Sequence, residues 1–175
     1  MKRWIFSDPH LGHKNIISFC GRPENHEEIM RENLSLSVGR EDVLYILGDV
    51  CFGNEQLLKS FLSSIHGRIY LIRGNHDKWT DTKYLLCGFD GVFDSVGVGD
   101  ILLTHEPVFL SGGLYRYNIH GHLHNLGYGS RKTKGEEFDC GTYDCFKDGK
   151  HILYSPELEN YKPVQISSLV ARAGK

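Results

Sequence analysis

The sequence has no long hydrophobic run. None of its apolar stretches approaches the roughly 20 residues that a transmembrane helix needs. The apolar run after the first basic residues, Trp4–Phe6, is too short for the core of a signal peptide. We therefore expect a soluble, cytoplasmic protein that has no membrane partner.

Cysteine is scarce and unpatterned, and neither sign of charge is in excess. The 5 cysteines form no C-x-x-C pair, which argues against a disulfide framework and against a cysteine-type zinc site. The 20 basic residues are balanced by 22 acidic ones, so that the formal net charge is -2. This balance excludes a strongly basic nucleic-acid binder, and we expect no strong sequence-specific binding of nucleic acids.

The rest of the composition is typical of a globular domain. The chain has 175 residues, of which 40% are hydrophobic and 24% are charged, and we expect one domain over residues 1–175. Histidine (10 residues) and glycine (20 residues) are abundant, and several glycines stand beside histidine or aspartate. This pattern indicates metal chemistry at glycine turns.

Short apolar runs alternate with amphipathic segments along the first half of the chain. Runs rich in β-branched and aromatic residues predict buried strands at residues 3–7, 43–47, 69–72, 101–104 and 117–119. Two helices are predicted between the first three strands. One begins at a capping box of Asn25 and Glu28 and ends at Gly39, and the other begins at Asn54 and ends at Gly67.

The second half of the chain has a different pattern. From Val92 onwards, runs around residues 92–104, 117–120 and 137–154 are separated by turns, and no strong helix is predicted before Ser167. The order strand, helix, strand, helix, strand is typical of a largely parallel sheet. We therefore predict an α/β fold in which two packed sheets are flanked by helices.

Each predicted strand is followed at once by polar residues. These clusters are Ser7–His10, Gly48–Asp49, Arg73–Asp77, His105 and His120–His124. Because loops at the carboxyl ends of strands in an open α/β sheet face one crevice, we expect the clusters to converge. Aspartate and histidine together suit manganese, iron or zinc better than calcium.

The ordered set of motifs resembles the calcineurin-like metallophosphoesterases. The motifs are D-x-H, G-D, G-N-H-D, a single histidine and G-H-x-H, in that order, from Asp8 to His124. The stretches SDPHLGHKNIIS, RGNHD and NYKPVQISSL resemble the small bacterial and phage members of that family. The resemblance implies the family's four-layer αββα sandwich, with two packed mixed sheets flanked by helices.

The resemblance also implies a site with two divalent transition-metal ions. We expect Mn²⁺ first, with Fe, Zn and Ni as alternatives, and a metal-bridging hydroxide as the nucleophile. One ion would be held by Asp8, His10 and His124, the other by Asn75, His105 and His122, with Asp49 bridging them. His76 would be the catalytic histidine, and Asp77 would orient its imidazole.

Other residues are candidates for contact with the substrate. Arg22, Arg73 and Arg116 could bind phosphate oxygens or could be ordinary surface charges. Tyr115 and Tyr117 could stack on a base, although Tyr117 also fits a strand core. His13 and His120 stand next to motifs and could support the site or bind substrate. His26, His66 and His151 lie outside every motif and are expected to be surface or helix-end residues.

These observations predict a metal-dependent phosphoric ester hydrolase with a small phosphoester or nucleotide-like substrate. No cap domain is visible between the motifs, so that a phosphodiester with a substituent on each side of phosphorus is favoured. The alternatives are a phosphomonoesterase, a non-catalytic scaffold of the same fold and a DNA nuclease subunit. The segment Val50–Asn54 lacks the V-D-R-G continuation of protein serine/threonine phosphatases, which argues against that class.

Overall fold

Two mixed sheets form the centre of the molecule. The computed structural model describes residues 1–128, 131–133, 136–138 and 140–173. The first sheet has the order β11-β1-β2-β3-β4, with β1 to β4 parallel and β11 antiparallel to β1. The bounds of these strands are β1 Arg3–Phe6, β2 Val43–Ile46, β3 Arg68–Ile72, β4 Gly91–Phe93 and β11 Val164–Gln165.

The second sheet has the order β10-β7-β6-β5. Strands β10, β7 and β6 are parallel, and β5 is antiparallel to β6. A separate antiparallel pair is formed by β8 (Arg131–Thr133) and β9 (Glu136–Phe138). The bounds of the four strands are β5 Val96–Val98, β6 Ile101–Leu103, β7 Tyr117–His120 and β10 His151–Leu153.

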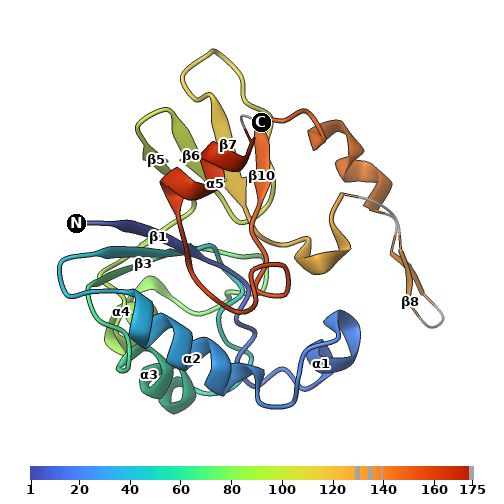
Figure 1. The fold of residues 1–175 in the computed structure, drawn as a ribbon. Helices are drawn as coiled ribbons and strands as arrows, with labels where there is room; N and C mark the ends of the chain where they lie inside the picture. The colour runs from blue at the N-terminus through green and yellow to red at the C-terminus, as the bar shows by residue number, and fades with distance from the viewer. Residues whose placement is uncertain (129–130, 134–135, 139, 174–175) are drawn as a thin grey trace.

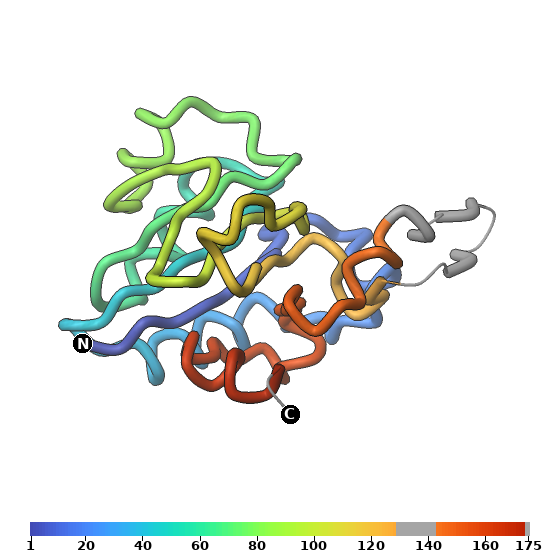
Figure 2. Tube along the Cα trace, turned by 90° about the horizontal axis from the view of Figure 1, so that it is seen from above, coloured from blue at the N-terminus to red at the C-terminus, as the bar shows by residue number. Residues whose placement is uncertain are grey.

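Helices flank the sheets. Figure 1 shows α2, α3 and α4 together below the five-stranded sheet, and α5 packs beside β1, β10 and β11. In Figure 2, α5 and the segment of residues 80–95 lie on opposite sides of the molecule, in agreement with the strand order from β11 to β4. The helices are α1 Asn15–Cys20, α2 His26–Ser37, α3 Glu55–Leu62, α4 Asp81–Cys87 and α5 Ile166–Ala173, with 3-10 helices η1 His124–Leu126 and η2 Cys140–Phe146. Among the described residues, no helix is both long and apolar enough to cross a membrane.

The predicted α/β fold with two mixed, helix-flanked sheets is confirmed. All five predicted strands are present, and Asn54 caps α3 by accepting a hydrogen bond of 3.0 Å from the Leu57 amide. Asn25 stands at the start of α2, but its side chain makes no capping hydrogen bond, so that the predicted capping box is wrong. Helices α1 and α4 were not predicted, because each is too short for a helical period to stand out.

The structure refines three further expectations. Helix α3 ends at Leu62, well before Gly67, which instead turns the chain into β3 with a φ of 81°. The run predicted at 137–154 contains η2 between β9 and β10, and its residue 139 lies outside the described residues. The run around 92–104 is divided between the sheets, because β4 joins the first sheet and β5 joins the second.

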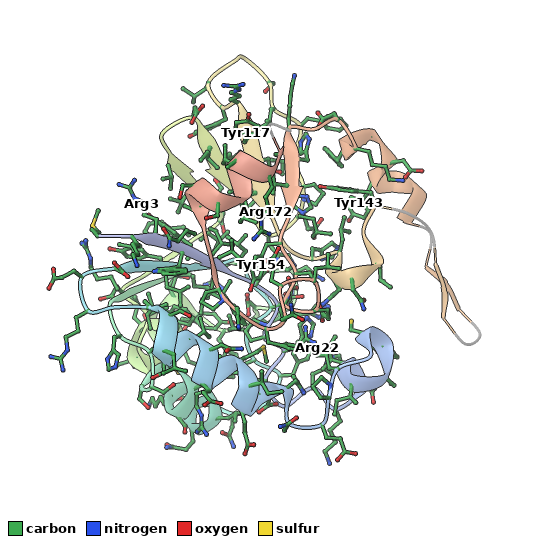
Figure 3. The ribbon with its side chains drawn as sticks, in the orientation of Figure 1. Arg3, Arg22, Tyr117, Tyr143, Tyr154 and Arg172 are labelled. Atoms are coloured by element: carbon green, nitrogen blue, oxygen red, sulfur yellow. The ribbon has the colours of Figure 1, made fainter. Side chains whose placement is uncertain are left out.

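One hydrophobic cluster joins the two sheets. The ring of Phe6 on β1 lies 5.8 Å from the ring of Tyr154, which follows β10, so that this pair connects the sheets. Both side chains are fully buried, and Figure 3 shows Tyr154 in the interior of the molecule. The Tyr154 hydroxyl donates a hydrogen bond of 2.9 Å to the Lys162 carbonyl, which fixes the segment that leads to β11.

We expect the hydroxyl group and the aromatic ring of Tyr154 to contribute separately to the free energy of unfolding. Tyr154→Phe removes only the hydrogen bond and should lower the free energy of unfolding by about 0.5–1.5 kcal/mol. Tyr154→Ala also leaves a cavity between the sheets and should cost about 3–5 kcal/mol. Urea unfolding of both variants measures the difference, and equal losses would contradict the proposed packing role of the ring.

Candidate metal centre

Polar side chains gather where the carboxyl ends of the parallel strands meet. Asp8 follows β1, Asp49 follows β2, His105 follows β6 and His122 follows β7. The loops of the two sheets are bonded to each other, because the His122 amide donates to Asp8 Oδ2 at 3.0 Å and His105 Nδ1 lies 2.7 Å from the Leu47 carbonyl. The predicted convergence of the loops is therefore observed.

The first group of side chains is Asp8, His10 and His124. Their ligand-type atoms lie within 4.8 Å of one another, and the Nε2 atoms of His10 and His124 are each 3.7 Å from Asp8 Oδ1. Burial alone would raise the pKa of Asp8, but the neighbouring His124 and His10 rings hold it well below its ordinary value. The Asp8 carboxylate is therefore ionised and available to a cation.

The second group is Asp49, His105 and His122, with Asn75 beside it. His105 Nε2 lies 3.5 Å from Asp49 Oδ2, 2.9 Å from Asn75 Oδ1 and 3.2 Å from His122 Nδ1. His105 Nδ1 lies 2.7 Å from the Leu47 carbonyl, an acceptor that requires the proton to be on Nδ1. His105 Nε2 is then an acceptor that faces the carboxylate of Asp49, an arrangement that a shared cation would stabilise.

Asp49 lies between the two groups. Its Oδ1 accepts a hydrogen bond of 2.9 Å from the His76 amide, which turns Oδ2 toward the centre. Oδ2 lies 3.6 Å from His10 Nε2 in the first group and 3.5 Å from His105 Nε2 in the second. Burial raises the pKa of Asp49 above its ordinary value, so that a neighbouring cation would favour its charged form.

Two buried polar atoms of the first group lack a hydrogen-bond partner within the described part of the chain. These atoms are Asp8 Oδ1 and His10 Nε2, and both face the centre. The other oxygen of Asp8 accepts hydrogen bonds from Ser7 Oγ at 2.5 Å and from the His122 amide at 3.0 Å. Because an unpaired buried polar atom is costly, this donor set fits a divalent cation.

The backbone of the loops has an uncommon conformation. In the described residues, positive φ angles at non-glycine positions are found at Asn160, Tyr161 and five members of the centre: Asp8, His10, Asp49, His122 and His124. Such angles cost energy and cluster at functional sites. Close approach also requires glycine at two positions, since a Cβ at Gly121 would clash with Ser7 and Asp8, and one at Gly74 would clash with Asp49.

Arg22 and Glu157 form an ion pair next to His124 of the first group. His124 Nδ1 lies 3.3 Å from Glu157 Oε1, and Arg22 Nε lies 2.7 Å from the same oxygen. Burial raises the pKa of Glu157, but the His124 hydrogen bond and the Arg22 charge outweigh it and lower that pKa to about 2. Burial lowers the pKa of His124, but the Asp8 and Glu157 carboxylates raise it well above its ordinary value.

The predicted phosphate contact of Arg22 is not supported by its position. Its side chain is fully buried, and its guanidinium also donates to the Asp8 carbonyl at 2.8 Å and to the Pro9 carbonyl at 3.0 Å. Figure 3 shows Arg22 between α1 and the body of the molecule. Arg22 therefore fixes the loop after β1, and its donors are not available to a substrate.

Arg73 is bonded to its own loop, whereas Arg116 agrees with the surface-charge alternative. The Arg73 guanidinium donates to the carbonyls of Asp77 and Trp79 and pairs with Asp81, so that it fixes its own loop. Arg116 precedes β7 and is exposed at the end of the strand opposite to His122.

Of the two tyrosines that were candidates to stack on a base, Tyr117 agrees with the alternative prediction of a strand core. Tyr117 begins β7 and belongs to the core, and Figure 3 shows it far from Arg22. Tyr115 packs against Gly97 on β5.

The sequence suggested that Asp77 orients the His76 imidazole, but its carboxylate oxygens are bonded to backbone amides instead. Its Oδ2 accepts hydrogen bonds of 2.8 Å from the amides of Asp49 and Gly74, and its Oδ1 accepts one of 3.0 Å from the Val50 amide. Burial raises the pKa of this carboxyl group. Asp77 is therefore a positioning residue that joins the loops after β2 and β3.

His76 is exposed at the edge of the centre. Its ring lies 6.3 Å from the His10 ring and 5.0 Å from the ring of Phe52. Its amide holds Asp49, and its imidazole is accessible to a bound molecule. This position is compatible with a role in proton transfer.

The remaining histidines have different positions. His13 lies beside the centre, with its Nδ1 3.1 Å from His10 Nδ1. His120 is fully buried and lies 2.7 Å from the Tyr128 hydroxyl, and burial lowers its pKa to about 4. His66 is exposed as predicted. His26 is buried but is the first residue of α2, in agreement with its predicted helix-end position. The side chain of His151 is buried on β10, so that its predicted surface or helix-end position is wrong.

Three neighbours of the centre were not found from the sequence. They are Phe52, Glu157 and Tyr143, whose hydroxyl lies 3.3 Å from His122 Nε2. Figure 3 shows that Tyr143 reaches the body of the molecule from η2. Glu157 lies far from every motif, and no sequence pattern connects it with His124.

A cleft of about 560 Å³ adjoins the second group. Asn75 and His105 form the part of its wall that belongs to the centre. Charged side chains of both signs contribute to the rest, namely Arg73, Asp77, Lys78, Asp94 and Glu106. A substituent of a bound molecule could enter this cleft from the His105 side of the centre.

Comparisons with known proteins give a matching family model and several similar proteins. The family model for calcineurin-like phosphoesterase matches residues 1–169. The chain is 31% identical to the uncharacterized protein MJ1445 of Methanocaldococcus jannaschii, over 97% of this chain and 89% of that protein. It is 32% identical to the gene 66 protein of Mycobacterium phage L5, over 59% and 62% of the two chains. A solved structure, a protein of unknown function from Aquifex aeolicus, has the same fold with a TM-score of 0.71, 24% identity and 98% coverage of both chains.

The low pKa of Glu157 predicts a pH-dependent contribution to stability. In metal-free protein near pH 7, Glu157→Gln should lower the free energy of unfolding by about 3 kcal/mol, from a pKa change of 4.5 to about 2. Because the folded-state pKa is the lower one, the contribution is present above about pH 4.5 and disappears as pH falls toward 2.

The control for this prediction is Glu159→Gln. Glu159 pairs with Arg172 at the surface and should contribute less than about 1 kcal/mol. Denaturant unfolding with a chelator present, at several pH values, measures both variants. A Glu157 effect that is small or independent of pH would contradict the buried ion pair.

Proposed function

Because the chain belongs to the calcineurin-like phosphoesterase family, we propose that it is a dinuclear-metal phosphodiesterase for nucleotide-like substrates. Membership of the family makes it a metal-dependent hydrolase of phosphoesters in general. We further propose the number of ions, the residues that bind them and a preference for diesters. We also propose that residues 1–175 form one domain.

The observation that carries the proposal is the position of Asp49 Oδ2 between two groups of ligand atoms. We propose that the two ions are Mn²⁺, with Fe, Zn or Ni as alternatives that Asp, His and Asn ligands also accept. Asp49 would bridge them, at 3.6 Å from His10 Nε2 and 3.5 Å from His105 Nε2. One ion would be held by Asp8, His10 and His124, the other by Asn75, His105 and His122.

The protein groups prepare the site for an in-line reaction at phosphorus. When bound, the two cations would neutralise phosphate charge and lower the pKa of water enough to make it a nucleophile near neutral pH. His76, exposed at the edge of the centre, would donate a proton to the leaving oxygen. Asp77 would keep the loops of Asp49 and His76 in register through its hydrogen bonds to backbone amides.

The distribution of charge around the centre favours a diester. A monoester carries nearly two negative charges near neutral pH, and a site specific for it needs several free cationic side chains. The guanidinium of Arg22 is buried, that of Arg73 is bonded to its own loop, and Lys78 shares its cleft with three carboxyl groups. A diester carries one negative charge and needs room for a second substituent, which the cleft supplies.

The alternatives from the sequence receive less support. A non-catalytic scaffold would not need the buried, unpaired Asp8 Oδ1 and His10 Nε2 atoms, which suit a cation, or the exposed His76 beside them. A phosphomonoesterase remains the alternative that the charge argument disfavours, and a direct comparison of substrates decides it.

We expect His76 and His122 to differ in their effect on metal content. His76→Ala should retain about two ions per chain and lower kcat by roughly 10²-fold or more, because it removes a proton donor and no ligand. His122→Ala should lose both metal and activity. Elemental analysis of saturated protein and kinetics with Mn²⁺ make the comparison. If His76→Ala also loses metal, or the wild type holds only one ion, the assignment is wrong.

We also expect diesters to be hydrolysed faster than monoesters. The kcat/KM for bis(p-nitrophenyl) phosphate should exceed that for p-nitrophenyl phosphate, and adenosine 2′,3′-cyclic phosphate should be preferred to adenosine monophosphate. The reason is the shortage of free cationic side chains around the centre among the residues whose side chains the structure describes. A consistent monoester preference of tenfold or more would refute the diesterase proposal and leave the metal site unaffected.

A further inference from the structure

An exposed aromatic side chain stands beside the first metal group. The ring of Phe52 is 38% exposed, although it lies within 5.0 Å of three histidine rings of the centre. It stacks on His13 at 4.3 Å and on His10 at 4.9 Å, with an interplanar angle of 14° in both cases. The His76 ring lies at 5.0 Å.

A second exposed aromatic ring extends this surface. Phe19 on α1 is 54% exposed, and its ring contacts His13 edge-on at 6.3 Å. Helix α1 is held beside the centre, because Asn125 Nδ2 donates to the Cys20 carbonyl at 2.9 Å. We name the surface of Phe52, His13 and Phe19 the aromatic shelf.

The position of Phe52 is fixed by the backbone. The amides of Phe52 and Gly53 donate to the Leu11 carbonyl at 2.8 and 3.2 Å, and the Leu11 amide donates to the Val50 carbonyl at 3.0 Å. These bonds join the segment after β2 to the loop that carries Asp8 and His10. A rigid aromatic surface binds a planar group at a low entropic cost.

The shelf and the cleft lie at different ends of the centre. The shelf contacts His10, which belongs to the first metal group, and the cleft is lined by His105 and Asn75 of the second. Asp49 lies between these groups. A phosphoester held at Asp49 would therefore have one substituent near the shelf and the other near the cleft.

We propose that the aromatic shelf stacks on a nucleobase of the substrate. The proposal rests on the proposed function, and it assigns to Phe52 a role in substrate specificity that the motifs do not contain. Exposed apolar rings beside a site of charged and polar ligands suit a planar, weakly polar group. Stacking on an aromatic side chain tolerates every base, because each base has a π face.

The test compares two ligands that differ only in the base. Adenosine monophosphate and ribose 5-phosphate are titrated by calorimetry into the Mn²⁺-loaded protein. The wild type should bind the nucleotide about 5- to 100-fold more tightly, the range expected for one stacked base. Phe52→Ala should remove this preference and leave the affinity for ribose 5-phosphate unchanged, while Phe52→Trp should retain the preference.

Controls separate stacking from a packing role. Leu36→Ala alters a side chain on α2 that is 79% exposed and should behave as the wild type. If Phe52→Ala weakens both ligands by the same factor, or reduces metal content, Phe52 only supports His10 and the proposal is wrong. Equal affinity of the wild type for both ligands also overturns it.

The outcome is separable from that of the proposed function. A wild-type protein that binds the nucleotide more tightly but hydrolyses no phosphoester would support base stacking on the aromatic shelf and refute the proposed enzymatic function. A wild-type protein that hydrolyses diesters but binds both ligands equally would support the proposed enzymatic function and refute base stacking on the aromatic shelf.

Discussion

Two carboxylates, Asp8 and Asp49, lie buried in one cluster of histidines, and a buried anion is stable only where donors or cations surround it. Each carboxylate uses one oxygen on protein donors and turns the other toward the centre. The loops must therefore bring amides to the outer oxygens and histidines to the inner ones. The left-handed backbone at five of these residues, and glycine at positions 74 and 121, are consequences of that requirement.

Surrounding ionic and polar contacts hold this arrangement in place. Asp77 binds the amides of Asp49, Val50 and Gly74, and thus fixes two loops with one side chain. Arg22 and Glu157 form a buried ion pair at 2.6 Å that touches both His124 and the Asp8 backbone. Removal of one partner from such a pair leaves an uncompensated charge, so these residues constrain the chain although none faces a substrate.

The surroundings of the centre differ between its two ends. Aromatic rings border the His10 end, and a cleft with charges of both signs borders the His105 end. A phosphodiester with two unlike substituents matches this asymmetry better than a small, doubly charged monoester does. In the proposed reaction the cations would then recognise the phosphate group, and protein side chains would recognise its two substituents.

The sequence by itself determined five of the strands and the polar clusters that converge, because hydrophobic period and short polar motifs are local signals, whereas the order of the strands within each sheet is a property of the tertiary structure. The sequence predicted the metal-ligand candidates from Asp8 to His124 for the same reason, since each follows directly on a strand. The tertiary structure alone decided what surrounds them. Arg22 stands near a motif but is directed into the interior by Glu157, 135 residues away in the chain. Phe52 became a neighbour of His10 only because an isolated bridge joins Leu11 to Cys51. Contacts of this kind depend on packing between distant segments, and no local pattern encodes them.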